Sequence, residues 1–107
     1  MFNKRKGYRV ERNIKIMFEK NEWTVMRAGA SLGQADLICL KNGRCILLQI
    51  KSTKKKSFYY YGYMNPEFQG FSFYLVVDFG YGKMRIMRPQ KKVELDDGKD
   101  LKDFLKE

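Results

Sequence analysis

One stretch of the chain, residues 35–51 (ADLICLKNGRCILLQIK), constrains the fold more than any other. Asn42 and Gly43 separate two apolar runs, and this arrangement is the strongest short signal for a β-hairpin with a two-residue turn. One face of the hairpin would then carry Leu37, Cys39, Ile46, Leu48 and Ile50, and the other Ile38, Leu40, Cys45 and Leu47. A hairpin that is apolar on both faces belongs at the centre of the core.

Three polar side chains meet at the open end of this hairpin. The two-residue turn pairs Lys41 with Arg44, and counting back along both strands places Asp36 directly across from Gln49. Lys51 points to the same face, two residues further along its strand. Polar residues at strand ends are often simply solvated, and a β-bulge would move Asp36 away from Gln49. The sequence leaves these alternatives open beside that of a functional site.

The charge of the chain indicates a polyanionic partner. The 107 residues have a net charge of +10, and residues 1–70 hold 14 Lys and Arg against 5 Asp and Glu, or +9 of that total. Such a basic field is most often used to bind nucleic acid, although solubility explains part of it. The length predicts a single domain over residues 1–107. The chain has no apolar run long enough to span a bilayer and no signal peptide, so we expect an intracellular protein.

The cysteines and the lack of histidine limit the chemistry. Cys39 and Cys45 fall on opposite faces of the hairpin, so we expect two thiols rather than a disulfide. The absence of histidine excludes zinc sites of the Cys/His type and histidine-based triads. Hydrolysis by this chain would need carboxylates, a lysine and a hard metal ion.

The remaining segments predict an α/β (α+β) fold with a mixed five-stranded sheet and flanking helices. A helix is expected from residue 7 to about residue 21, after a basic leader over residues 1–6, with an apolar stripe of Val10, Ile14, Met17 and Phe18. Glu11 borders that stripe. Strands are expected at residues 23–27, 35–41, 44–51, 71–79 and 83–87. Short helices are expected to start at residues 65–67 and at Asp97 or Gly98.

Lys54, Lys55 and Lys56 stand directly before a run of aromatic residues, Phe58, Tyr59, Tyr60, Tyr61 and Tyr63. Lysines can meet phosphates while aromatic rings stack on bases, which suits a nucleic-acid surface. The alternative is a solvated lysine turn, with Tyr59 and Tyr61 packed into the core.

The acidic residues suggest a site for a hard cation. Glu11 and Asp36, if close together, offer the oxygen ligands that Mg²⁺ and Mn²⁺ prefer, and the Gln49 side chain and the Ile50 carbonyl offer two more. A cation in this position activates water and polarises a phosphodiester. Lys51 is placed to orient that water or to stabilise the negative transition state.

These residues resemble the PD-(D/E)xK nuclease superfamily, and within it the archaeal-type Holliday junction resolvases. Four separated blocks in the same order carry the resemblance, over roughly residues 4–56: residues 5–7 with Glu11-Arg12, then WTVMRAGAS at 23–31, ADL at 35–37 and CILLQIK at 45–51. The resemblance implies a restriction-endonuclease-like core and a Mg²⁺-dependent endonuclease, with Mn²⁺ as a substitute. It also implies a homodimer that cuts DNA symmetrically, with four-way junctions as the DNA partner.

The resemblance assigns roles residue by residue. It places Glu11, Asp36 and Gln49 around the metal, with the Ile50 carbonyl as a further ligand, and makes Lys51 the catalytic lysine. Ser31 matches a further position of the catalytic site. The expected DNA-binding residues are Lys4, Arg5, Lys6, Arg12, Arg27, Lys54, Lys55 and Lys56.

The chain departs from the resolvase pattern in two places, and these keep other functions open. Gln49 stands where the resolvases carry Glu, and after Lys56 the chain lacks the long helix that they place before the next strand. A restriction-, homing- or repair-type nuclease on the same core, or a DNA-binding protein that has lost cleavage, are the alternatives. An RNA- or single-strand-binding module would leave the core polar residues unexplained. We expect a cytoplasmic, nucleoid-associated protein or a viral protein in the host cytoplasm.

Overall fold

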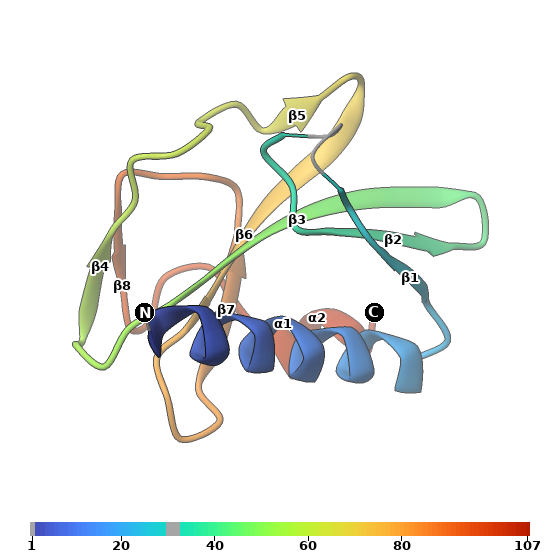
Figure 1. The fold of residues 1–107 in the computed structure, drawn as a ribbon. Coiled ribbons are helices and arrows are strands. Elements are labelled where there is room, and N and C mark those ends of the chain that lie inside the picture. Colours follow the sequence, from blue (N-terminus) through green and yellow to red (C-terminus); the bar gives the residue numbers. More distant parts are fainter. Residues whose placement is uncertain (1, 30–32) are drawn as a thin grey trace.

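A mixed β-sheet built around the predicted hairpin organises the molecule (Figure 1). The computed structural model describes residues 2–29 and 33–107, with side chains from residue 7 onward. Along the chain the elements are α1 (Phe2–Lys20), β1 (Thr24–Arg27), β2 (Leu37–Lys41), β3 (Arg44–Ser52), β4 (Ser57–Tyr59), β5 (Glu67–Phe68), β6 (Phe71–Asp78), β7 (Met84–Met87), β8 (Lys92–Glu94), β9 (Lys99–Asp100) and α2 (Leu101–Leu105).

The β2–β3 hairpin has the register that the sequence predicts. Lys41 pairs with Arg44 across the turn, where Asn42 and Gly43 take φ values of 48° and 78°. Positive φ at both central residues is the type I′ geometry that suits the twist of a hairpin, which explains the Asn-Gly pair. The ladder continues to Leu37 opposite Leu48, and the Asp36 amide donates to the Leu48 carbonyl at 2.7 Å. Regular pairing ends there, because the Asp36 amide bonds to β3 while the Asp36 carbonyl accepts from the Ala28 amide on the other side. Asp36 therefore lies just before β2 and reaches Gln49 through its side chain.

All five predicted strands are present, in the order β1-β2-β3-β6-β7, and β3 pairs with β6 in parallel. Two short strands bring the sheet to seven within the described residues, since β5 pairs with β6 and β9 with β7. A separate two-stranded ribbon, β4–β8, lies outside the sheet. The prediction of a helix starting at residues 65–67 is wrong, because these residues lead into the strand β5. β5 forms a hairpin with β6, and the turn between them contains Gln69 and Gly70, both at positive φ.

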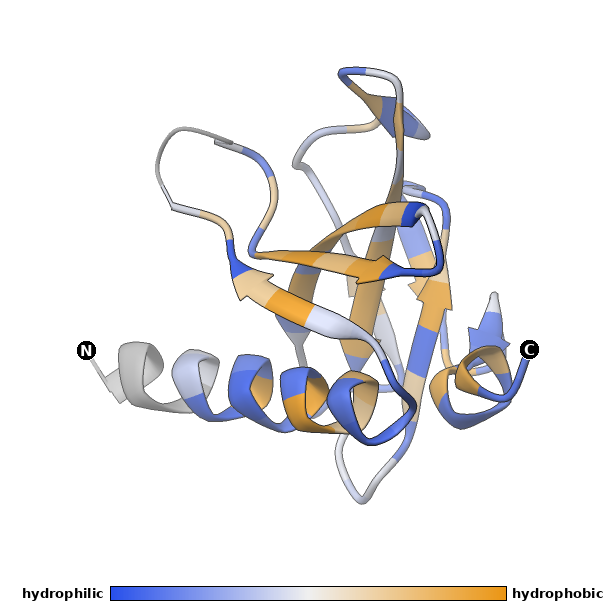
Figure 2. Ribbon diagram, turned by 90° about the vertical axis from the view of Figure 1, so that its right-hand side faces the viewer, coloured by the Kyte–Doolittle hydropathy of each residue, from blue (hydrophilic) through white to orange (hydrophobic). Residues whose placement is uncertain are grey.

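Both helices pack on one face of the sheet (Figure 2). The stripe of α1 (Val10, Ile14, Phe18) and the apolar residues of α2 (Leu101, Phe104, Leu105) meet the hairpin face that carries Leu37, Cys39, Ile46, Leu48 and Ile50. Burial of these side chains provides the main hydrophobic stabilisation of the fold. Cys39 and Cys45 are free thiols, as predicted.

The opposite face of the sheet is covered by the chain between β3 and β9. Beneath the β4–β8 ribbon, Tyr60 and Val93 pack on Leu75, Val77 and Met87. Nearer β1 and β2, Leu47 and Phe73 pack with Ala35. Gln49 lies on this face, and Asp36 bonds to it from the start of β2.

Both helices begin at other residues than predicted, and β2 begins at Leu37 rather than at residue 35. The helix α1 begins at Phe2 rather than Gly7, because residues 2–6 contain good helix formers and no breaker, so the basic segment expected ahead of the helix is its first part. The last helix begins at Leu101 and not near Asp97, because Lys99 and Asp100 first pair with β7; the Asp100 side chain then caps the helix by accepting from the Lys102 amide. No helix of the described residues is long and apolar enough to cross a membrane.

Candidate nuclease site

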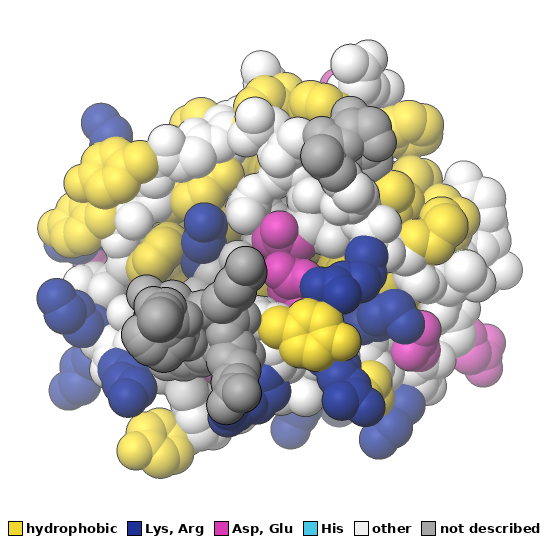
Figure 3. Space-filling model, viewed as in Figure 1, with side chains coloured by type: hydrophobic (Ala, Val, Ile, Leu, Met, Phe, Trp, Pro, Cys, Tyr) yellow, Lys and Arg dark blue, Asp and Glu magenta, His cyan; other side chains and the backbone are white. Residues whose placement is uncertain are grey.

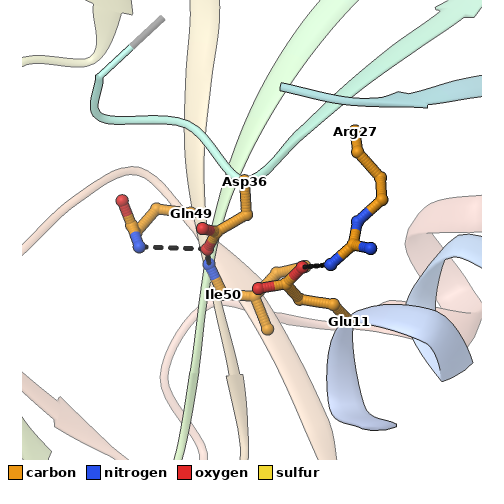
Figure 4. Close-up of polar contacts among 5 residues, drawn as sticks. All are labelled: Glu11, Arg27, Asp36, Gln49 and Ile50. Carbon is orange, nitrogen blue, oxygen red and sulfur yellow. Dashed lines mark hydrogen bonds and ion pairs between the residues drawn. The ribbon is translucent and has the colours of Figure 1, made fainter. Parts of the chain in front are cut away.

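The Asp36 carboxylate lies where β2 begins, against the far half of β3 (Figure 4). Its Oδ2 accepts two hydrogen bonds, from the Ile50 backbone amide at 2.7 Å and from Gln49 Nε2 at 3.0 Å. The backbone bond fixes the carboxylate to the centre of the sheet. The pairing of Asp36 with Gln49 that the sequence predicts is therefore a direct side-chain contact.

Partial burial makes this carboxylate costly to ionise. Burial raises the pKa of Asp36 above its ordinary value, while the Ile50 amide and the positive charges of Lys51 and Arg27 act in the opposite direction. Lys51 is exposed on β3, within electrostatic range of Asp36. A cation bound here would neutralise a charge that the protein alone compensates incompletely.

Glu11 lies beside this cluster rather than within it. Its Oε1 accepts from Arg27 Nη2 at 3.2 Å, and Arg27 also acts on Asp36, so the guanidinium is shared between the two carboxylates. Glu11 lines a groove of about 180 Å³ between α1 and the start of β2, with Arg12, Arg27 and Leu37. Figure 4 shows Glu11 and Asp36 approaching this region from α1 and from the sheet.

The donor set fits a hard cation after two adjustments. No group of three or more His, Cys, Asp and Glu side chains occurs in the described part of the chain, so an oxygen shell needs Gln49 and the Ile50 carbonyl besides the two acids. Gln49 directs its nitrogen at Asp36 and its oxygen away (Figure 4), so the amide has to turn over to bind a cation. Arg27 has to release Glu11.

The groove contains two side chains that sequence reasoning missed, Tyr8 and Lys15. They stand one turn before and one turn after Glu11 on α1, and the Arg27 guanidinium lies 4.7 Å from the centre of the Tyr8 ring. Helical periodicity around Glu11 was the signal that could have found them.

The basic residues surround the acidic centre. Figure 3 shows acidic side chains in the middle of one face, with Lys and Arg side chains on both sides. Arg12 and Arg27 line the groove, and Lys54, Lys55 and Lys56 follow β3. Lys4, Arg5 and Lys6 belong to α1, with side chains outside the description, and Ser31 lies outside the described residues.

The alternative that Tyr59 and Tyr61 pack into the core is wrong. Tyr59 and Tyr61 are 52% and 78% exposed, whereas Tyr60 between them is 2% exposed. Tyr60 therefore enters the face that carries Gln49.

Comparisons with known proteins agree with this architecture. The family model described as archaeal Holliday junction resolvase (Hjc) matches residues 2–64. The solved structure of Archaeoglobus fulgidus Hjc, a Holliday junction resolvase from an archaeal hyperthermophile, superposes with a TM-score of 0.70 at 15% identity, over 95% of this chain and 97% of that one. At this identity the superposition concerns the fold. No curated protein matches the sequence.

Proposed function

This chain belongs to the family of archaeal Holliday junction resolvases, and from that premise we propose how it cuts DNA. Its function is that of a structure-specific junction nuclease, an endodeoxyribonuclease whose partner is branched DNA. The proposal concerns the metal, the residues and the oligomeric state. The observation that carries it is the Asp36 carboxylate held by Gln49 and by the Ile50 amide.

We propose that Asp36, Glu11, the Gln49 oxygen and the Ile50 carbonyl hold Mg²⁺, with Mn²⁺ as a substitute. The bound cation supplies activated water and charge neutralisation at the scissile phosphate. Lys51 contributes an exposed ammonium group near Asp36 that orients the water and stabilises the developing charge. Arg27 exchanges its bond to Glu11 for a phosphate, which guanidinium groups bind well, and so frees Glu11.

The other basic residues bind the DNA backbone in this proposal. Arg12 lines the groove beside Glu11, and Lys54, Lys55 and Lys56 follow β3, the strand that carries Gln49 and Lys51. Lys4, Arg5, Lys6 and Ser31 keep the roles that the family resemblance implies. The site of action is the cytoplasm, where the cellular or viral DNA is found.

The chain is proposed to act as a homodimer, because each copy has one such site and symmetric cleavage requires two. The predicted fold leaves several apolar side chains unplaced, and these are the candidates for the contact: Phe58, Tyr60, Tyr63, Phe68, Phe71 and Ile16. Phe71 and Ile16 are 48% and 37% exposed and stay in this set. The others leave it, because Tyr60 is buried, Phe58 packs against the same cluster, and Tyr63 packs edge-on against Phe68.

The test compares an end-labelled four-way junction with duplex, flap and single-stranded DNA, each with Mg²⁺, Mn²⁺ or EDTA. We expect symmetric nicks in the junction, in the presence of metal only. Junction binding without cleavage in any metal would instead identify a DNA-binding protein that has lost cleavage. Cutting of plain duplex at a preferred sequence would identify a restriction-type nuclease. In sedimentation, a mass of only 12.7 kDa with and without junction DNA would exclude the dimer.

A further inference from the structure

One aromatic side chain stands outside the core and beside the acidic residues of the site. Tyr8 of α1 is 52% exposed, and none of the three apolar clusters found in the described residues includes it. It lines the groove of about 180 Å³ that also contains Glu11, Arg12 and Arg27. A ring that is half exposed gains little stability from burial, so its role has to be sought in what it contacts.

The Arg27 guanidinium lies over the ring of Tyr8. Its central carbon is 4.7 Å from the centre of the ring, inside the range of about 6 Å within which an aromatic face attracts a cation. The same guanidinium donates through Nη2 to Glu11 Oε1 at 3.2 Å (Figure 4). Tyr8 and Glu11 are three residues apart on α1 and so lie on the same side of the helix. Arg27 is therefore held by two side chains of α1, a ring and a carboxylate.

The backbone of Arg27 is fixed, whereas its side chain is open to solvent. Arg27 pairs with Leu37 at the end of β1, and the amide of the next residue, Ala28, donates to the Asp36 carbonyl at 2.9 Å. These bonds hold the Arg27 backbone one strand away from Asp36. The Arg27 side chain is 54% exposed, so a DNA phosphate can reach the guanidinium from solvent.

The two contacts of the guanidinium differ in what they leave free. The bond to Glu11 occupies an N–H donor, and a phosphate would compete for donors of the same kind. The attraction to the Tyr8 ring acts on the charge of the guanidinium and uses no carboxylate acceptor, so it persists when the bond to Glu11 is broken. Without the ring, an arginine that leaves Glu11 would regain its rotamer freedom, and the phosphate would have to order the side chain again.

We propose that Tyr8 is a positioning residue for Arg27 in DNA binding, an inference that rests on the proposed exchange of Glu11 for a phosphate. The ring keeps the guanidinium at the groove while its N–H donors pass from Glu11 Oε1 to a phosphate oxygen. Less ordering of Arg27 is then needed when the DNA backbone binds. The aromatic face of Tyr8 is required for this role, and its hydroxyl is not.

The test is Tyr8→Leu, with Tyr8→Phe as the matched control because phenylalanine keeps the aromatic face and lacks only the hydroxyl. Junction binding is measured by fluorescence anisotropy in EDTA at one low salt concentration, so that neither metal nor cleavage enters the result. We expect Tyr8→Leu to bind the junction about two- to five-fold more weakly, as the loss of an exposed cation–π contact implies, and Tyr8→Phe to bind like the wild type. Urea unfolding should be unchanged in both variants, because the ring is outside the core and leucine is a good helix former.

Two arginine backgrounds separate an effect through Arg27 from a direct contact between Tyr8 and DNA. Adding Tyr8→Leu to Arg27→Ala should cause no further loss of binding. Adding it to Arg12→Ala, which removes another arginine of the same groove, should cause the full loss.

Several outcomes would overturn the inference: unchanged binding in Tyr8→Leu, an equal loss in Tyr8→Phe, or a further loss when Tyr8→Leu is added to Arg27→Ala. A less stable Tyr8→Leu protein would also overturn it, since the ring would then serve the fold. If Arg27→Ala alone binds the junction like the wild type, the phosphate contact of Arg27 in the proposed function fails, and the inference fails with it.

Discussion

At the scale of single residues, the site combines a backbone-anchored carboxylate with a neutral partner. Asp36 is fixed by the Ile50 amide, but the side chain beside it is an amide that supplies no charge to a cation. Without metal, Gln49 satisfies Asp36 by donating to it, where a glutamate would repel it. The protein therefore has a stable metal-free arrangement, which the proposed metal binding would undo.

Asp36→Asn is expected to abolish cleavage while preserving junction binding and stability. The loss of cleavage should exceed the ~10–100-fold typical of removing an outer-shell partner. Because burial raises the native pKa of Asp36 above the ordinary 3.8, the proton is bound more tightly in the folded state. Protonated Asp36 therefore contributes most to the stability of the fold below about pH 3.8, the pKa of the unfolded chain. This contribution is lost as the pH rises through the higher pKa of the folded state.

The Asn variant should consequently match or exceed wild-type stability at pH 7, with any advantage disappearing near pH 3.5. Urea unfolding at both pH values and cleavage assays at pH 7 check this. A variant that cuts at the normal rate would show that Asp36 is no metal ligand. A variant clearly less stable at pH 7 would contradict the direction of the pKa shift.

Substitutions of Gln49 should shift the metal dependence of cleavage in opposite directions. Gln49→Glu adds a charge for the cation, so less metal should be needed, although the metal-free variant should unfold more easily with two carboxylates in contact. Gln49→Ala should lower activity, with partial recovery in excess Mn²⁺. Cleavage rate against metal concentration is measured for all three proteins. Superimposable curves would mean that Gln49 is not a ligand.

At the scale of elements, the turn of the β2–β3 hairpin determines which residues meet at the open end of the hairpin, where the site lies. The turn sets the register, and the register brings Asp36 to Gln49 and Ile50. The helix α1 contributes Glu11, which forms an ion pair with Arg27 of β1. The ribbon β4–β8 closes the opposite face with Tyr60.

Gly43→Ala should destabilise the protein by about 1–2 kcal/mol, because Gly43 has a φ of 78°, which side chains with Cβ disfavour. The metal dependence of cleavage should not change, since the turn lies at the far end of the hairpin. Gly7→Ala is the opposite control: Gly7 is helical with open space around it, so alanine should stabilise by about 0.5–1 kcal/mol. Urea unfolding measures both. Equal stabilities for Gly43→Ala and the wild type would contradict the type I′ turn.

At the scale of the whole molecule, the charge is arranged for a polyanion. Residues 1–70 hold +9 of the net +10, and they contain the site as well as the lysines that follow β3. The acidic centre lies between basic side chains (Figure 3), so phosphates on both sides of a cut strand meet positive charge.

Junction binding should weaken steeply with salt, with a log–log slope of about −0.9 for each phosphate neutralised. Replacing Lys54, Lys55 and Lys56 by Ala should flatten this slope by about 0.9 for each phosphate that the variant no longer neutralises. The matched control replaces three lysines of a different groove, Lys20, Lys102 and Lys106. Fluorescence anisotropy of Asp36→Asn in EDTA, over a range of salt concentrations, measures the slopes. Equal effects of the two sets of substitutions would contradict a DNA surface beside β3.

The sequence by itself determined the centre of the fold and of the site. The Asn42-Gly43 turn and the alternation of side chains are local signals, and they were enough for the hairpin register, the five main strands and the contact of Asp36 with Gln49. The apolar stripe of α1 was equally local, although residues 2–6 extend the helix beyond it.

Only the tertiary structure decided which groups surround that centre. The segment after Lys56 has no strong period, and its strands β4 and β5 are three and two residues long. Such short strands exist because distant partners pair with them, as β8 pairs with β4, and this pairing buries Tyr60 while exposing Tyr59 and Tyr61. Likewise, Glu11 meets Arg27 only because α1 and β1 dock on the same edge of the sheet. Contacts between residues far apart in sequence depend on how the elements pack, which no local pattern encodes.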